Sequence, residues 1–386
     1  MRILTSLTYY RPHYSGLTIY AERLACSLAR RGNAVTVLTS RYDRSLPPRE
    51  RQDGVEIIRP EVLMHISKGV IMPSILFWAW KIIRQSDVLL LHVPQLDAAP
   101  ISLLARLMGK PVVLTYHCDL YLPSGFIHFI ANQVSHIANH ISAIAAQAIV
   151  TNTRDYAENS PFLRRYIFKV KVIPPPVELP PAAGADIQEF RRKARIQPGQ
   201  RIIGMAARFA TEKGVEYLVE AMPVILKKYP RARVLFMGQY QNVLGEELYI
   251  QKLAPLIASL DEAWTFLGNL SPAELAVFYQ ECEVTVLPSI NSTESFGMVQ
   301  VEAMYCGTPV VATDIPGVRQ PVKMTGMGRI IPPANAEALA QAILEILDRP
   351  EDYRKDVRAV IKTFSPETIA AQYEELFKDL ILRERG

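Results

Sequence analysis

Short apolar runs alternate with amphipathic segments along this 386-residue chain, and the alternation strongly limits the folds open to it. One series of runs occupies the first half, and a second series starts at residue 201. The first series comprises residues 3–7, 34–39, 55–58, 88–92, 112–116, 148–151 and 170–173. The second comprises residues 201–206, 234–237, 265–267, 284–287 and 310–312. Strands that alternate with helices predict an α/β protein with parallel sheets covered by helices.

A proline-rich segment separates the two series. Prolines at 174–176 and at 180–181 hold the chain extended, so we expect an interdomain linker at about residues 174–186. A chain of 386 residues is long for one core. We therefore predict domains at residues 1–180 and 181–365, followed by a helix at 366–386.

Cysteine content and apolar run length bear on where the protein works. The four cysteines show neither metal-type spacing nor the density of a disulfide scaffold, which fits a reducing cytoplasm. The N-terminus enters a strand with no signal peptide ahead of it, and no apolar run reaches the ~18–20 residues of a membrane span. We expect a soluble cytoplasmic protein, or one peripheral at the inner face of the membrane.

Charge is unevenly distributed. Residues 1–180 contain 20 Lys and Arg against 12 Asp and Glu, a net charge of +8, whereas the remainder has a net charge of −3. A basic first half could attract an anionic partner such as a phospholipid surface or a lipid diphosphate, and ordinary surface charge is the alternative. Nucleic acid is disfavoured, because no basic run is interleaved with aromatic residues.

The stretch from Glu294 to residue 313 carries the most specific chemical signal. It predicts a polar loop, a helix that begins near Gly297 and ends at Gly307, and a buried strand. The free N–H groups at a helix start attract phosphate, whereas the carboxylates of Glu294 and Glu302 suit hydroxyl groups. A diphosphate flanked by hydroxyl-rich groups describes a nucleotide sugar.

Two cations follow a strand of the second series. Arg208 comes directly after the run 202–206, and Lys213 lies five residues further on. Residues at the carboxyl ends of strands in an open α/β sheet face the ligand crevice. Fixed cations there would neutralise a diphosphate and stabilise it as a leaving group. A solvated Arg and a Lys at a helix start are the alternative interpretation.

Four motifs, in this order along the chain, resemble glycosyltransferase family 4. They are Tyr-His-Cys-Asp at 116–119, Ala-Arg-Phe-Ala-Thr-Glu-Lys-Gly at 207–214, Phe-Leu-Gly at 266–268, and Glu-x7-Glu with Gly-Thr-Pro-Val-Val-Ala at 294–312. The resemblance runs nearly end to end. It implies a GT-B fold, with two Rossmann-like domains facing a central cleft, the acceptor held by the first and the nucleotide sugar by the second. It also implies that the terminal helix crosses back to the first domain.

The resemblance also implies roles for individual residues. Arg208 and Lys213 would contact the diphosphate, Glu294 the sugar hydroxyls and Glu302 the ribose diol. The base would lie near Phe266 and Leu267. Backbone amides at the start of the helix would cap the diphosphate: Phe296, Gly297, Met298 and Val299.

In the first domain, the resemblance places His117 near the reacting centre and Gly16 near phosphate. The family usually has two adjacent glycines where this chain has Gly16 and Leu17, which leaves the loop path open. We expect His117, Glu294, Arg208 and Lys213 to be the catalytic set. A structural role for His117 is the alternative.

The resemblance implies a retaining transferase for a hexose-type sugar, active in polysaccharide or glycolipid synthesis without a metal or other cofactor. A sugar-nucleotide 2-epimerase and a non-catalytic nucleotide-sugar-binding subunit remain alternatives. A hydrolase with paired carboxylates would not need the anion site. A nicotinamide dehydrogenase is disfavoured because no GxGxxG follows the first strand.

An apolar, aromatic segment at 65–83 bears on the acceptor. Trp78 and Trp80 lie near Lys68, Lys81 and Arg84, as in a helix that docks at a membrane interface. Packing of residues 70–83 against the sheet or a partner subunit is the alternative.

Overall fold

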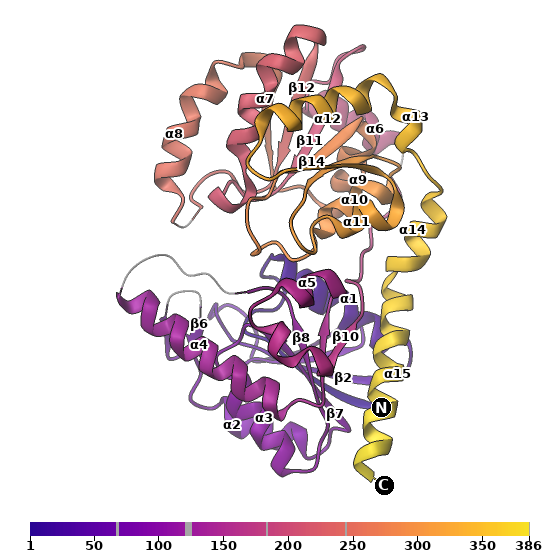
Figure 1. Ribbon diagram of the computed structural model, residues 1–386. Coiled ribbons are helices and arrows are strands. Elements are labelled where there is room, and N and C mark those ends of the chain that lie inside the picture. Colours follow the sequence, from indigo (N-terminus) through magenta and orange to yellow (C-terminus); the bar gives the residue numbers. More distant parts are fainter. Residues whose placement is uncertain (67–68, 120–125, 183, 244, 386) are drawn as a thin grey trace. The chain divides into compact units, whose positions relative to one another are not determined.

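The computed structural model describes residues 1–66, 69–119, 126–182, 184–243 and 245–385. The chain forms two compact units (Figure 1). Unit 1 comprises Met1–Pro176 together with Phe364–Gly386, and unit 2 comprises Val177–Thr363. The last helix of the chain therefore belongs to the same unit as the first strand.

Unit 1 is built on a sheet with the strand order β10-β9-β8-β7-β1-β2-β4-β3, in which only β3 pairs antiparallel. Its strands are β1 (Arg2–Ser6), β2 (Ala34–Leu38), β3 (Arg49–Gln52), β4 (Val55–Ile58), β7 (Val88–Val93), β8 (Val112–Tyr116), β9 (Ala148–Thr151) and β10 (Val170–Val172). A separate hairpin joins β5 (Met64–Ile66) and β6 (Gly69–Ile71). The chain order reverses between β1 and β7.

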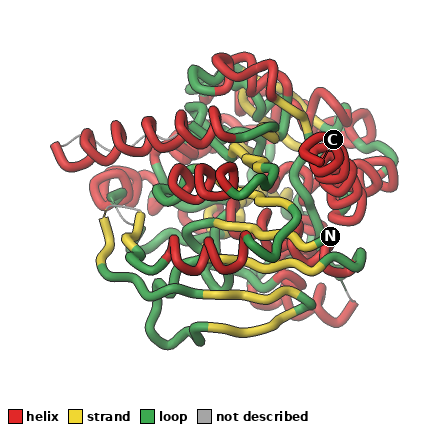
Figure 2. The backbone as a smooth tube through the Cα atoms, turned by 90° about the horizontal axis from the view of Figure 1, so that it is seen from below, coloured by secondary structure: helices red, strands yellow, loops and turns green. Residues whose placement is uncertain are grey.

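Helices pack on this sheet because each presents an apolar stripe to it. Figure 2 shows the strands side by side with helices packed around them. The helical elements are α1 (Gly16–Arg30), α2 (Ile75–Ile83), α3 (Ala98–Leu107), α4 (Phe126–Ala145), α5 (Arg154–Asn159), η1 (Leu163–Lys169) and α15 (Pro366–Arg385). Leu4, Leu38 and Ile58 of the strands share one core with Ile75 and Ile83 of α2.

Helix α15 is fastened to unit 1 by a buried hydroxyl network. The Tyr373 hydroxyl lies 2.8 Å from the Tyr20 hydroxyl of α1 and 2.9 Å from Thr115 Oγ1 of β8. All three side chains are buried. Glu374 accepts hydrogen bonds from Arg31 and Asn33 at the other end of α1. Buried hydroxyls need such partners, so the network fixes where the helix lies.

Unit 2 has a fully parallel sheet with the strand order β13-β12-β11-β14-β15-β16. The strands are β11 (Arg201–Ala206), β12 (Ala232–Met237), β13 (Trp264–Gly268), β14 (Val284–Leu287), β15 (Val310–Thr313) and β16 (Gly328–Ile331). The chain builds outward from β11 to β13 and then returns to place β14 on the other side of β11. This reversal is the topological switch point of a Rossmann-like sheet.

The remaining elements of unit 2 surround this sheet. They are α6 (Gly184–Lys193), η2 (Thr211–Lys213), α7 (Val215–Lys228), α8 (Glu247–Ala258), η3 (Asp261–Ala263), α9 (Pro272–Glu281), α10 (Met298–Tyr305), α11 (Gln320–Thr325), α12 (Ala336–Asp348), α13 (Pro350–Tyr353) and α14 (Val357–Phe364). Met222 of α7 and Leu339 of α12 join Phe236 and Trp264 of the strands in one core.

The parallel sheets confirm the α/β prediction, and two regions differ from the sequence patterns. The charged strand β3 has no apolar alternation, because it lies at a solvated edge of the sheet. The segment expected to be one interfacial helix is a hairpin followed by α2, which begins only at Ile75, after Pro73. Lys68 lies outside the described residues. Within the described part of the chain, no helix has the length and apolar character of a membrane span.

The hydroxyl network predicts a graded effect on stability. Tyr373→Phe removes both hydrogen bonds and leaves two buried hydroxyls short of a partner, so we expect the free energy of unfolding to fall by about 2–3 kcal/mol. Tyr20→Phe removes one bond and leaves Tyr373 paired with Thr115, so about 1 kcal/mol is expected. Urea unfolding of both variants measures the difference, and an equal or larger loss in Tyr20→Phe would contradict the network.

Candidate functional site

The switch point of unit 2 brings together two loops that are distant in sequence. Strands β11 and β14 pair in parallel, so their carboxyl ends open at the same edge of the sheet. The loop after β11 carries Arg208 and Lys213, and the loop after β14 carries Glu294. Ligands of open α/β sheets bind in the crevice at such a point. The two motifs identified separately in the sequence therefore converge.

Glycines at two positions allow this close approach. Gly214 precedes α7 with a φ of 65°, and a Cβ there would lie 2.2 Å from the carbonyl oxygen of Pro288 in the other loop. Gly297 precedes α10 with a φ of 80°, and its Cβ would lie 2.3 Å from Leu287 Cδ2. A side chain at Gly214 would force the two loops apart, whereas one at Gly297 would displace the side chain of Leu287 at the end of β14. A positive φ itself favours glycine at both positions.

Buried polar contacts hold the second loop in place. The Gln300 side chain donates to the carbonyls of Phe296 and Val318, at 2.8 and 2.9 Å. Thr313 Oγ1 donates to the Ser289 carbonyl at 2.7 Å. The loop is thus fixed at both ends, so the backbone N–H groups at the start of α10 have a defined direction. The side chain of Phe296 is buried, while Met298 and Val299 are half-buried.

The convergence produces an ion pair across the two loops. Lys213 Nζ lies 2.6 Å from Glu294 Oε2, and the two side chains are 18% and 19% exposed. Arg208, whose side chain is 50% exposed, contacts Glu212 at 2.8 Å. One ammonium and one carboxylate therefore stand together beside the start of α10, with a second cation nearby in sequence. This arrangement offers groups for both an anion and hydroxyls.

Glu302 lies inside the protein with 5% of its surface exposed, so it is not a surface charge on an amphipathic helix. It accepts a hydrogen bond from the Tyr279 hydroxyl of α9 at 3.2 Å. Burial, and secondarily the neighbouring Glu302 carboxylate, raise the pKa of Tyr279 well above its usual value, so this hydroxyl stays a donor. Burying a carboxylate costs free energy even when it accepts a hydrogen bond, so Glu302 is a candidate for a ligand-binding role.

The neighbouring strands end in an aromatic pair. Phe266 of β13 stacks on Tyr240, with ring centroids 4.3 Å apart and planes 13° apart. Phe266 and Leu267 are half-buried. They stand at the same carboxyl edge of the sheet as Arg208, two strands further out.

In unit 1, His117 follows β8 at the carboxyl edge of the sheet. Its Nε2 lies 2.9 Å from Nδ1 of His92, which belongs to the adjacent strand β7, and the rings are nearly parallel. Tyr20 of α1 packs edge-on against His117. Burial lowers the pKa of His117 to about 3 and, together with His117 itself, lowers that of His92. Both imidazoles are therefore neutral at ordinary pH.

The hydrogen-bond pattern indicates which tautomer His117 adopts. The fully buried Nε2 of His92 has no hydrogen-bond partner among the described residues. An orphaned buried N–H is rarer than an orphaned acceptor, so His92 favours the tautomer with hydrogen on Nδ1. His92 then donates to Nε2 of His117, which leaves the hydrogen of His117 on its Nδ1. His117 accordingly presents an N–H donor rather than a base.

Sequence reasoning missed His92. The signal was available, since its strand and that of His117 are consecutive in a predicted parallel sheet and both histidines fall near their carboxyl ends. Asp119 accepts hydrogen bonds at its Oδ1 from the hydroxyl groups of Tyr116 and Ser160, at 2.8 and 2.7 Å. Gly16 is the exposed first residue of α1, which Ser15 caps by accepting from the Thr18 N–H.

The neutral histidine pair predicts acid sensitivity. Below the unfolded pKa of about 6.5, the unfolded chain binds protons that the folded chain excludes, so stability falls as pH falls. Between pH 7 and 5.5 each histidine should lower the free energy of unfolding by about 1 kcal/mol. The double variant His92→Gln and His117→Asn should flatten this dependence in urea titrations. His65→Gln, at an exposed position, is the control and should leave the slope unchanged.

Comparison with known proteins identifies the family of each half of the chain. Residues 186–363 match the model for glycosyl transferases group 1, and residues 15–176 match that of the glycosyl transferase 4-like domain. An uncharacterized glycosyltransferase of Methanocaldococcus jannaschii is 25% identical over 86% of this chain and 85% of its own. A D-inositol 3-phosphate glycosyltransferase of Pseudarthrobacter chlorophenolicus is 27% identical over 87% of this chain and 82% of its own.

Among solved structures, Anabaena HepE in complex with UDP superimposes with a TM-score of 0.78. The two sequences are 20% identical, and the superposition covers 98% of this chain and 100% of the HepE chain. The two proteins therefore share a fold. The two family models together span most of both units. The chain belongs to the group 1 glycosyltransferases and has the GT-B fold, with two Rossmann-like domains.

Proposed function

We propose that this glycosyltransferase moves a hexose-type sugar, with retention, from a nucleoside diphosphate carried by unit 2 to a carbohydrate or lipid-linked acceptor. The product would belong to polysaccharide or glycolipid synthesis in the cytoplasm. The observation that carries the proposal is the ion pair of Lys213 with Glu294 at the switch point between β11 and β14. It joins a phosphate-binding cation to a hydroxyl-binding carboxylate at one place.

The diphosphate would lie between the cations and the start of α10. Lys213, and Arg208 after it swings from Glu212, would bind phosphate oxygens together with the N–H groups of residues 296–299. An exposed guanidinium can make such a change at little cost, because surface ion pairs are weak. These donors would stabilise negative charge as it develops on the leaving diphosphate.

Glu294 would accept hydrogen bonds from the sugar, and Glu302 from the ribose diol. Tyr279 supports the second role, because its hydroxyl fixes the orientation of the Glu302 carboxylate. The base would stack near Phe266 and Tyr240. UDP is our first candidate, since HepE was solved with UDP.

In the transfer itself, the bond from the anomeric carbon to the diphosphate oxygen breaks, and a bond to the acceptor oxygen forms on the same face. The acceptor proton passes to the released diphosphate. His117, neutral and carrying hydrogen on Nδ1, would donate to a sugar hydroxyl, and the first turn of α1 at Gly16 would approach phosphate. The cations and the helix start supply the positive charge, so we propose that no metal or other cofactor takes part.

A nucleotide-sugar panel tests the donor site. We expect one of UDP-glucose, GDP-mannose and ADP-glucose to raise the melting temperature, by an amount equivalent to about 2.7 kcal/mol at a hundred times its Kd. Lys213→Met should abolish most of this shift and lower kcat by about 10²–10³, whereas Lys227→Met, an exposed control on α7, should change neither. EDTA should leave the rate unchanged.

The outcomes of this panel separate the remaining alternatives. Donor binding without transfer to any acceptor would favour the binding subunit, and a changed sugar configuration at C2 would favour the epimerase. An undiminished shift in Lys213→Met would overturn the diphosphate site itself.

We also propose that unit 1 docks on an anionic membrane through one face of α2. Phe77 is 58% exposed and Trp80 is 42% exposed on this face, and Arg84 lies 4.9 Å from the Trp80 ring. Leu63, before the hairpin, is 71% exposed. Exposed aromatic residues beside cations are typical of interfacial helices, and the net charge of +8 over residues 1–180 adds attraction to anionic lipid.

Vesicle co-sedimentation measures this docking. The double variant Phe77→Ser and Trp80→Ser should weaken binding to phosphatidylglycerol vesicles by at least about tenfold, because it removes two apolar anchors. Leu107→Ser, at an 86% exposed position on α3, is the matched control. Equal binding of the unmodified protein to neutral phosphatidylcholine vesicles would rule out electrostatic attraction to anionic lipid. Equal binding by the double variant and by Leu107→Ser would rule out docking through the α2 face.

A further inference from the structure

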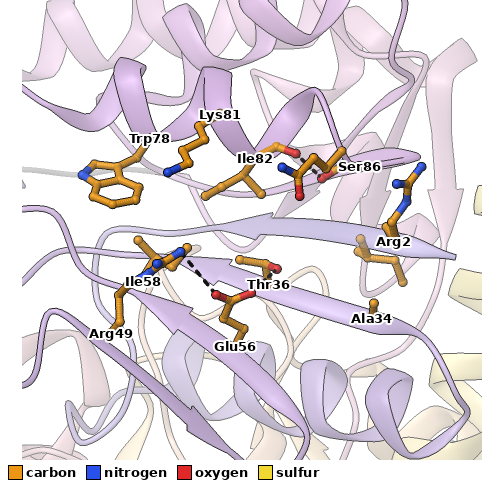
Figure 3. A pocket seen from close by; sticks show the side chains of 12 residues that line it. Arg2, Ala34, Thr36, Arg49, Glu56, Ile58, Trp78, Lys81, Ile82 and Ser86 are labelled. Atoms are coloured by element: carbon orange, nitrogen blue, oxygen red, sulfur yellow. Dashed lines mark hydrogen bonds and ion pairs between the residues drawn. The ribbon is translucent and has the colours of Figure 1, made fainter.

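A pocket of about 250 Å³ lies in unit 1 between α2 and the sheet (Figure 3). Its apolar surface comes from Ile58 of β4 with Trp78 and Ile82 of α2. Thr36 and Glu56 line it from β2 and β4. The sheet and α2 form the two walls of the pocket, and each wall contributes both polar and apolar side chains.

Two cations converge in this pocket from opposite walls. Lys81 Nζ of α2 lies 5.5 Å from the centroid of the Trp78 ring, and the guanidinium of Arg49, from β3, lies 5.4 Å from it. Figure 3 shows Lys81 beside the indole, and Arg49 on the opposite wall, where a dashed line joins it to Glu56. Like charges brought to one ring repel each other, and an anion between them would remove that repulsion.

The carboxylates at hand neutralise only part of this charge. Arg49 forms a salt bridge with Glu56 at 3.5 Å, with both side chains about half exposed. A third lining cation, Arg2, is paired with Asp87 at 3.3 Å. Lys81 forms no salt bridge with any described residue, so three cations against these two carboxylates leave a net charge of +1.

The pocket is separate from the proposed donor site and from the proposed membrane face. Arg2 and Ala34, which line it, begin their strands, whereas His117 follows the carboxyl end of its strand. The apolar residues that α2 contributes to the pocket, Trp78 and Ile82, are half-buried, in contrast to the exposed Phe77 and Trp80.

We propose that this pocket binds a phosphate ester, with the phosphate between Lys81 and Arg49 and the attached group against Trp78 and Ile82. Lysine and arginine are the side chains that bind phosphate best, and the indole and aliphatic walls suit an apolar or ring-shaped substituent. A phospholipid head group and a soluble phosphate ester share this chemistry.

Matched variants within unit 1 test the site. The probes are glycerol 3-phosphate in isothermal titration, and phosphatidylglycerol diluted in phosphatidylcholine vesicles in co-sedimentation. Lys81→Met keeps the aliphatic stem and should weaken binding by about tenfold or more, because one charged partner is lost. Arg49→Gln should do the same from the opposite wall. Lys171→Met removes an exposed cation of β10, at the opposite edge of the sheet, that does not line the pocket, so binding should stay within about twofold.

Each outcome decides the proposal. Saturable binding of glycerol 3-phosphate that Lys81→Met and Arg49→Gln weaken supports the site with a soluble ester. The same selective loss seen only with vesicles supports it with a lipid head group. Absence of binding to both probes, or equal loss in Lys171→Met and Lys81→Met, would overturn it. Donor binding should be unchanged in all three variants, which separates failure here from failure of the proposed function.

Discussion

The contact between Lys213 and Glu294 depends on one topological fact, that β14 returns to pair with β11. Eighty-one residues separate the two side chains, and neither loop alone forms a site. The approach requires glycine at Gly214, because a Cβ there would collide with the carbonyl oxygen of Pro288 in the other loop. Backbone geometry thus places the charges before any ligand arrives, and electrostatic stabilisation is effective when the groups are fixed in advance.

In unit 1, too, the strand order brings distant side chains together, here two neutral histidines. The chain order of its sheet reverses between β1 and β7, and the adjacent strands β7 and β8 bring His92 and His117 together. Tyr20 packs on His117 and is bonded in turn to Tyr373 of the last helix. The C-terminal helix therefore supports the surroundings of His117, although it follows the whole of unit 2 in the sequence.

Helix α2 presents different chemistry on its two sides. The outward residues Phe77 and Trp80 are exposed, while Trp78 and Lys81 line a pocket over the partly covered sheet. A nine-residue helix with aromatic residues on both sides cannot bury both against one sheet. Surface left uncovered in this way is where a partner or ligand gains most from binding.

The sequence by itself determined the α/β class, the parallel sheets and the family, because alternating apolar runs and the motifs at 116–119, 207–214 and 294–312 are local features of the chain. Strand order, the burial of Glu302 and the pairing of His92 with His117 were decided by tertiary structure. The local pattern of Glu302 equally fits a surface charge, and only packing against Tyr279 places it inside. Such contacts join residues tens of positions apart, and no periodicity within one element encodes them.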